Sequence, residues 1–190
     1  MTRFGRLFRD GVTTFALLGL IALLALKMNN RPELIQTGSF YVVDGDTLAQ
    51  DGDRLRLLGI DAPEYRQQCQ RDHVGWACGE EARKALDKLM KTAPAECRGS
   101  EHDRYGRLLV TCKAGDVDIN SAMVRSGMAV SYGGYAAEEA AARQARAGLW
   151  AGDFERPRDY RREEQAERAR SGDPLAGLGD YLRRFVGWDR

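Results

Sequence analysis

The sequence has few of the residues that build a zinc site. Only two histidines occur, His73 and His102, and they lack the spacing of metal ligands. The four cysteines include no Cys-x-x-Cys pair. Zinc binding is therefore the weaker interpretation of the cysteines, because an even number of cysteines in an exported chain is typical of disulfides.

The sequence also lacks an excess of either charge, since its formal net charge is +1. The segment from Gly38 to Trp150 contains 15 Lys and Arg and 17 Asp and Glu, a net charge of −2. A protein that coats nucleic acid usually carries a basic stripe, so this composition disfavours such a module. Internal repeats and long low-complexity stretches are absent as well.

One apolar run stands near the N-terminus. Residues 12–26 carry no charge and follow Arg3, Arg6 and Arg9, a pattern that indicates a targeting element. A signal-peptide core has about 7 to 15 residues and a membrane helix about 17 or more, so this run lies at the border between the two. Because no small-x-small cleavage site follows, we favour an uncut membrane anchor, with the arginines in the cytoplasm and the rest in the periplasm or outside the cell. A cleaved segment would instead give a secreted protein.

At 190 residues and 43% hydrophobic composition, the chain is long enough for one core but not two. Past Trp150 the composition shifts to arginine and glutamate, and Leu175, Leu178, Leu182 and Phe185 then recur at helical spacing. We interpret this end as a solvated arm with a short amphipathic helix, and a membrane-surface helix is the alternative. The predicted segments are a cytoplasmic N-terminus (1–11), a transmembrane segment (12–28), a linker (29–37), a folded domain (38–160) and the charged arm (161–190).

Short strands and helices alternate within the predicted domain. An Asp-Gly turn at 51–52 separates two strand-like runs, and Glu80–Met90 places its alanines and leucines on one helical face. This pattern predicts an α+β fold that is compatible with a small barrel. Strands are predicted at Ser39–Val43, Thr47–Gln50, Arg54–Ile60 and around Cys97 and Cys112, and further helices near Val117–Ser126 and Ala136–Ala147.

The cysteines allow three disulfide pairings. Cys97 lies in a strand-like run before a turn, and Cys112 lies in the run just after it. Opposed strands of one hairpin would bring these two cysteines together. This pairing leaves Cys69 with Cys78, which would close the loop that follows Glu64.

Three short runs bring carboxylates and arginines to the ends of predicted strands: Asp44–Thr47, Arg56–Glu64 and Asp103–Arg107. Carboxylate oxygens bind Ca²⁺ or Mg²⁺, and guanidinium groups bind phosphate oxygens. A site that has both can neutralise the charge that develops during phosphoryl transfer.

These runs resemble the staphylococcal nuclease (thermonuclease) family. The resemblance extends from about Gly38 to Trp150 and includes Asp118–Asn120, Met123–Ala129 and Ala147–Trp150. Each run alone is weak, whereas their order and spacing together are specific. The resemblance implies an α+β, mainly β fold, built on a five-stranded OB-type barrel with about three helices.

The resemblance also implies a metal site. Asp46 and Asp61 match the metal-binding aspartates of the family, and Ala62 would supply a backbone carbonyl. Ligands that are all oxygen favour Ca²⁺, with Mg²⁺ as the competitor. A role in turn formation is the alternative for the aspartates, but it fits Asp44 better than Asp46.

Glu64 matches the carboxylate that activates or orients the attacking water in this family. Arg56 and Arg107 match its two arginines that grip the phosphoryl oxygens and stabilise charge in the transition state. Surface ion pairing is the alternative role for each arginine. Both arginines stand in register with matched carboxylate motifs, which favours the catalytic interpretation.

Substrate contacts follow from the same resemblance. Tyr105 matches a family tyrosine, and Arg104 stands where the best-known member has lysine. Tyr135 matches one tyrosine of the nucleotide pocket, but Gly133 stands at the position of the other, with Tyr132 displaced by one residue. Base stacking is therefore expected to be weaker or rearranged.

We therefore predict an exported, Ca²⁺-dependent nuclease that hydrolyses DNA, RNA or both with low sequence specificity. The near-neutral charge favours an enzyme that grips phosphate locally. The main alternative is a non-catalytic OB-type module that binds nucleic acid, glycan or protein, and another phosphodiester substrate would keep the same catalysis. We expect a monomeric domain, with nucleic acid as substrate and the membrane as the second partner, and infer no protein partner.

Overall fold

A computed structural model describes residues 3–29 and 32–170. The predicted amphipathic helix at the C-terminus lies outside these residues. The strands are β1 (Leu34–Gly38), β2 (Tyr41–Val42), β3 (Thr47–Gln50), β4 (Asp53–Leu57), β5 (Ile60–Asp61), β6 (Cys69–Arg71), β7 (Val74–Trp76), β8 (Ala95–His102), β9 (Leu108–Ala114), β10 (Val117–Asp118) and β11 (Val130–Ser131). The helices are α1 (Arg3–Asn29), α2 (Cys78–Met90), α3 (Ile119–Arg125), α4 (Ala136–Gln144) and α5 (Pro157–Arg170), with a 3₁₀ turn η1 at Gly148–Ala151.

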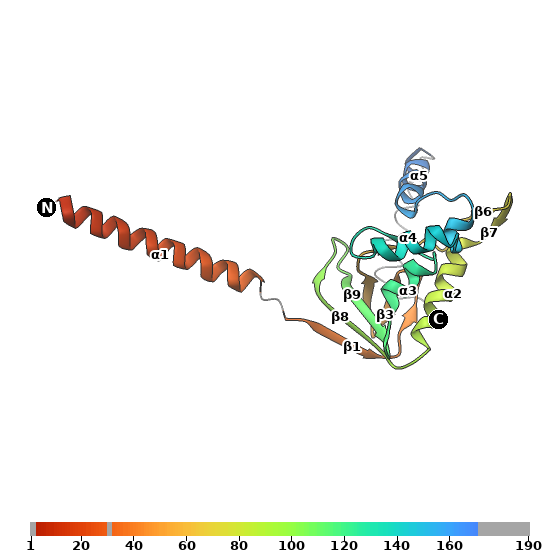
Figure 1. The fold of residues 1–190 in the computed structure, drawn as a ribbon, viewed down its shortest axis with the longest axis horizontal. Coiled ribbons are helices and arrows are strands. Elements are labelled where there is room, and N and C mark those ends of the chain that lie inside the picture. Colours follow the sequence, from red (N-terminus) through yellow and green to blue (C-terminus); the bar gives the residue numbers. More distant parts are fainter. Residues whose placement is uncertain (1–2, 30–31, 171–190) are drawn as a thin grey trace.

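The main sheet has the strand order β1-β8-β9-β4-β3-β2, with β10 paired to β9. All its pairs are antiparallel except β4 with β9. The sheet curls into a half-barrel, and α2, α3 and α4 lie together beside it (Figure 1). The α+β prediction is confirmed. Within the described residues, a seven-stranded curled sheet, two small two-stranded sheets and five helices are consistent with the predicted OB-type fold, with more strands and helices than the five and about three expected.

The core lies between this sheet and the helices. Leu48, Leu55 and Val110 from the sheet pack with Leu86 of α2 and Met123 of α3. All five side chains have no exposed surface. Because successive residues of a strand point to opposite faces, the residue between the core leucines Leu55 and Leu57 of β4 points away from the core.

The predicted strand at Arg54–Ile60 is divided in the structure. β4 ends at Leu57, and β5 begins at Ile60. Gly59 lies between them with φ +78, in the left-handed region that favours glycine. The resulting turn lets β5 leave the main sheet and pair with β11, where Asp61 stands opposite Val130.

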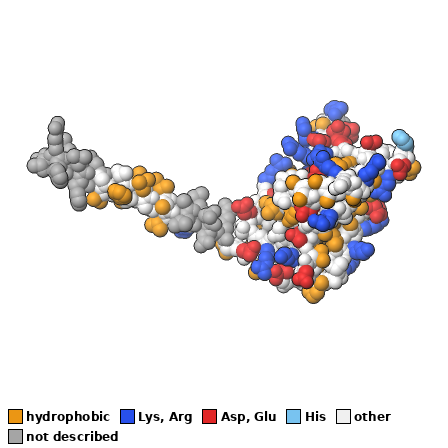
Figure 2. Space-filling view, viewed as in Figure 1, with side chains coloured by type: hydrophobic (Ala, Val, Ile, Leu, Met, Phe, Trp, Pro, Cys, Tyr) orange, Lys and Arg blue, Asp and Glu red, His pale blue; other side chains and the backbone are white. Residues whose placement is uncertain are grey.

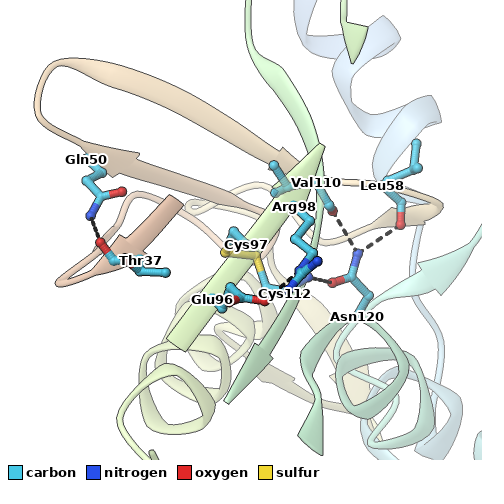
Figure 3. Close-up of a disulfide and its surroundings, with 9 residues drawn as sticks. All are labelled: Thr37, Gln50, Leu58, Glu96, Cys97, Arg98, Val110, Cys112 and Asn120. Atoms are coloured by element: carbon cyan, nitrogen blue, oxygen red, sulfur yellow. Dashed lines mark hydrogen bonds and ion pairs between the residues drawn. A yellow bond between two sulfur atoms is a disulfide. The ribbon is translucent and has the colours of Figure 1, made fainter. Parts of the chain in front are cut away.

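Both disulfides have the pairing expected from the sequence. Cys97 and Cys112 face each other across β8 and β9, so the hairpin itself brings their sulfurs together (Figure 3). Cys69 at the start of β6 is joined to Cys78, the first residue of α2. The second bond closes the segment that follows Glu64 and fixes it to the helix.

α1 covers the predicted transmembrane segment at residues 12–28. Within the part of the chain that the structure describes, no helix has both the length and the apolar character that crossing a membrane requires. The structure thus does not support the predicted anchor.

Candidate active site

Two close backbone contacts bring the acidic segments together. A Cβ atom on Gly45 would lie 2.6 Å from the Ala62 Cβ and 2.8 Å from the Ala82 Cβ. A Cβ atom on Gly79, near the start of α2, would lie 1.8 Å from the Glu64 carbonyl oxygen. Glycine at both positions therefore allows the loop before β3, the segment after β5 and α2 to meet at one place.

Arg56 lies at the point where these segments meet. It stands in β4 between Leu55 and Leu57, whose side chains enter the core, so its own side chain points the other way. One terminal nitrogen donates to Asp46 Oδ1 at 2.7 Å, and the other donates to Asp61 Oδ1 at 2.8 Å. A single guanidinium fork thus holds both predicted metal-binding aspartates.

The Asp46 carboxylate is buried and has several donors. The Ala62 backbone N–H donates to Oδ2 at 3.1 Å, and the Thr47 hydroxyl donates to Oδ1 at 3.0 Å. Its own backbone N–H donates to Asp44 Oδ1 at 3.0 Å, which shapes the turn. Asp44 therefore has the turn-forming role that the sequence indicated, and Asp46 faces the site.

Glu64 follows β5 on a loop that a buried glutamine holds. Gln67 accepts the Glu64 N–H through its side-chain oxygen at 3.2 Å and donates to the Glu155 carbonyl at 2.7 Å. The Gln67 side chain has no exposed surface. The Glu64 side chain is 33% exposed, so it is accessible from solvent while its backbone is fixed.

A third arginine enters the site from α5. Arg161 donates from one terminal nitrogen to Asp61 Oδ1 and Oδ2, at 2.9 and 3.0 Å. Its other terminal nitrogen donates to Glu64 Oε1 at 2.7 Å. The sequence interpretation of residues 161–190 as a solvated arm is wrong for Arg161, because this side chain lies across two predicted site carboxylates.

Burial dominates the electrostatics of the aspartates. It raises the pKa of Asp46 to about 6, with a further increase from the charge of Asp44 and an opposing effect of Arg56. Burial also raises the pKa of Asp61; Arg161 and Arg56 oppose this shift and the Asp46 charge adds to it. The two arginines thus do not fully offset the cost of burying the negative charges of Asp46 and Asp61. A bound cation would favour the ionised form of both carboxylates.

The oxygen donors fit a hard cation such as Ca²⁺, but the protein supplies few of them. Among the described residues, no three His, Cys, Asp or Glu side chains are grouped so that they could hold a metal ion. Asp46, Asp61 and the Ala62 carbonyl would leave several of the six to eight positions of Ca²⁺ for water and substrate. Any cation bound here would therefore depend on water and substrate for most of its ligands.

Sequence comparison decides the family. The profile of the family described as "Staphylococcal nuclease homologue" matches residues 54–152, just over half of the chain. The chain belongs to the staphylococcal nuclease family. The matched region begins within β4 and ends after η1, so it contains Arg56, Asp61 and Glu64.

Three relatives illustrate the range of this nuclease family. The succinoglycan biosynthesis protein ExoI of Rhizobium meliloti (strain 1021) is 36% identical over 121 residues, which cover 60% of this chain and 63% of that protein. Protein ParB of Escherichia coli is 36% identical over 130 residues (57% and 68%). An uncharacterized endonuclease of Escherichia coli O157:H7 is 32% identical over 120 residues (57% and 72%). The chain thus spans less than two thirds of the Rhizobium relative.

Arg107, the second arginine predicted for the site, lies in the turn between β8 and β9. Arg107 pairs with Asp103, with Nε at 2.8 Å and a terminal nitrogen at 2.6 Å from Oδ2. Among the described side chains, no hydrogen bond or ion pair joins Arg107 to Asp46, Asp61 or Glu64. Hydrogen bonds thus connect five of the predicted site residues, Asp46, Arg56, Asp61, Ala62 and Glu64. Arg107 stands on the β8–β9 hairpin, directly before Leu108, which pairs with Leu55 of β4.

The predicted substrate contacts divide in the same way. Tyr105 is exposed and lies near two guanidinium groups, those of Arg104 and Arg107, at 4.7 and 5.5 Å from the ring centroid. Tyr135 instead packs beside the Gly59 turn, and burial raises its pKa to about 12, with added effects of Asp118 and Glu138. Tyr105 is therefore an exposed aromatic side chain, whereas Tyr135 is partly used in packing.

Sequence reasoning missed two site residues, Gln67 and Arg161. A glutamine that holds a loop has no local signature. The segment around Arg161 lacks the apolar residues that would have predicted its packing, and its partners lie 97 and 100 residues earlier in the chain. Pro157, the first residue of α5, was the available signal, because proline is favoured at the first position of a helix.

Proposed function

We propose that this chain is a divalent-cation-dependent nuclease that hydrolyses phosphodiester bonds in DNA, RNA or both, with low sequence specificity. The observation that best supports this function is the Arg56 fork, which holds Asp46 and Asp61 beside Glu64 in a member of the staphylococcal nuclease family. A binding module would not require a cation-binding pair, a solvent-accessible carboxylate and arginines together.

Ca²⁺ is the proposed cation, with Mg²⁺ as the competitor, and Asp46, Asp61 and the Ala62 carbonyl would hold it. When bound, the cation supplies positive charge that stabilises the anionic phosphoryl group. Burial of the aspartates strengthens this electrostatic effect, because charges interact more strongly away from bulk water.

Glu64 is the proposed general base. Its carboxylate would accept a proton from the water that attacks phosphorus, while its backbone is fixed by Gln67. Arg56 and Arg107 would bind the phosphoryl oxygens, on which negative charge grows toward the transition state. Because both guanidiniums pair with aspartates here, substrate would have to share or replace those contacts.

Nucleic-acid contacts would extend from the β8–β9 hairpin. Arg104 would attract phosphate, and the exposed Tyr105 ring offers a stacking surface for a base. Tyr135 would contribute less, since it packs against the Gly59 turn. Basic and acidic side chains are interspersed on the face shown in Figure 2, which suits an enzyme with local phosphate contacts and weak overall binding.

We also propose that the domain works outside the cytoplasm. All four cysteines are paired in disulfides, and such bonds persist in oxidising compartments. Peptide mapping without reductant, on protein recovered from the cell envelope or medium, should find both bonds. Four free thiols would contradict export.

The nuclease function is tested with the purified full-length chain on single- and double-stranded DNA and on RNA. Cleavage is expected with Ca²⁺, should stop in excess EGTA and should return when Ca²⁺ is restored. Glu81→Gln serves as the matched control for Glu64→Gln, because Glu81 is an exposed glutamate of α2 that pairs with Lys84. Activity that persists in excess chelator, or that survives in Glu64→Gln, would contradict the proposal.

A further inference from the structure

Arg161 occupies the oxygens that a cation would use. Asp61 Oδ1 accepts from both Arg56 and Arg161, and Oδ2 accepts from Arg161. A carboxylate that coordinates a cation must direct a lone pair of at least one oxygen at it. Arg161 and Arg56 together occupy both lone pairs of Oδ1 and one of Oδ2, so a cation on Asp61 has one lone pair of Oδ2 left and otherwise competes with the Arg161 guanidinium for this carboxylate.

The position of Arg161 is fixed from the base of α5. The first residue of the helix, Pro157, is buried. Just before Pro157, the Glu155 carbonyl accepts a hydrogen bond from the side-chain nitrogen of the buried Gln67. The side-chain oxygen of Gln67 accepts the Glu64 N–H. The preceding segment packs on β6, where the Gln70 N–H donates to the Asp153 carbonyl at 2.8 Å. The start of α5 and the Glu64 loop thus form one connected unit that presents Arg161 to the site.

The ion pairs of Arg161 differ from those of its neighbours on α5. Arg162 is 73% exposed and lies 3.7 Å from Asp159 of the same helix. Arg161 is 32% exposed, and its carboxylate partners belong to β5 and the loop after it. Exposed ion pairs within a helix contribute little to stability. An ion pair on a largely buried carboxylate has a stronger effect, because it alters how that carboxylate binds other ions.

We propose that Arg161 sets the cation affinity of the active site by competing with the divalent cation for Asp61. This inference rests on the cation site of the proposed function. Docking of Arg161 on Asp61 and binding of the cation there oppose each other. By thermodynamic linkage, Arg161 weakens cation binding, and the cation loosens α5 to the same extent.

The direct test measures cation binding without substrate. Calorimetric titration of the full-length chain with Ca²⁺ is carried out for the parent, Arg161→Gln and the control Arg162→Gln. Arg161→Gln should bind Ca²⁺ about tenfold more tightly, within the usual range of coupling between sites. Arg162→Gln removes the same charge from the same helix and should stay within about twofold of the parent, as an exposed pair predicts.

Hydrogen exchange supplies the reciprocal measurement. Ca²⁺ should accelerate amide exchange in α5 of the parent and should leave α5 exchange unchanged in Arg161→Gln. Should the glutamine variant not fold, Arg161→Lys replaces it, because an ammonium group cannot form the fork across Asp61 and Glu64. This variant should also bind Ca²⁺ more tightly than the parent.

Two results would overturn the inference while leaving the nuclease function intact. Ca²⁺ affinity in Arg161→Gln that equals or falls below that of the parent would exclude competition. An equal gain of Ca²⁺ affinity in Arg162→Gln would show that the effect comes from the net charge of α5 and not from the contact of Arg161 with Asp61. Absence of Ca²⁺ binding in every variant, together with no cleavage, would refute the cation-dependent function and this inference with it.

Discussion

Replacing Asn120 with alanine should destabilise the domain by about 3 kcal/mol, because buried backbone groups would lose their partners. Asn120 is the second residue of α3 and has no exposed surface. Its side-chain oxygen accepts the Cys112 N–H at 3.0 Å, and its nitrogen donates to the Leu58 carbonyl at 3.0 Å and the Val110 carbonyl at 3.2 Å (Figure 3). One side chain therefore joins α3, β9 and the turn that leads to β5.

The magnitude follows from counting what remains unpaired. The Val110 carbonyl keeps the Leu58 N–H at 2.8 Å, so it still has a donor. The Cys112 N–H is buried and loses its acceptor, which costs about 1–3 kcal/mol, whereas the carbonyl of the exposed Leu58 loses one hydrogen bond, worth about 0.5–1.5 kcal/mol. Values near the middle of the two ranges, about 2 and about 1 kcal/mol, add to about 3 kcal/mol.

Urea unfolding monitored by circular dichroism measures this loss, with Ser121→Ala as the neighbouring control. The control should stay within about 0.5 kcal/mol, because the Ser121 hydroxyl makes only a 3.4 Å contact to Glu138. In a domain of this size, 3 kcal/mol corresponds to about 6–12 °C in melting temperature. A loss below about 1 kcal/mol would refute the reasoning, because one orphaned group alone should cost that much.

Three further predictions concern the site and its supports. Asp46→Asn and Asp61→Asn should each raise the Ca²⁺ concentration required for half-maximal cleavage, measured by titration; unchanged values would exclude them as ligands. Arg107→Ala should lower kcat more than it raises KM, since charge on phosphate grows toward the transition state, and a change in KM alone would make it a binding residue. Reduction of Cys97–Cys112, whose cysteines are 15 residues apart, should lower the free energy of unfolding by about 3 kcal/mol, and thermal melts with and without reductant measure it.

Local features of the fold could be predicted from the sequence. The Asp-Gly turn joins β3 to β4, and the spacing of Cys97 and Cys112 around one hairpin gave the observed disulfide. The order of the sheet could not be predicted, because it depends on the parallel pairing of β4 with β9, which are about 50 residues apart in sequence. Strand periodicity shows which face is buried but not which strand is the neighbour.

The same distinction holds for the site. The β3–β4 hairpin places Thr47 opposite Arg56, and the turn at Gly59 leads on to Asp61. The proximity of Asp46, Arg56, Asp61 and Glu64 therefore follows from structure that is local in the sequence. Arg161 depends on the docking of α5, which uses a buried proline and backbone contacts instead of an apolar helical face. An arginine-rich helix without such a face gives no periodic signal of the surface it meets.

The most direct test of the central claim is the single-turnover cleavage rate of Glu64→Gln relative to the parent at saturating Ca²⁺, on one DNA and one RNA substrate. An amide cannot accept a proton from water, and general-base catalysis contributes about 10²- to 10⁴-fold. The variant should retain the folded spectrum and bind Ca²⁺, while its cleavage rate falls by about that factor. A rate within about threefold of the parent would contradict the assignment of Glu64, and with it the mechanism proposed for this site.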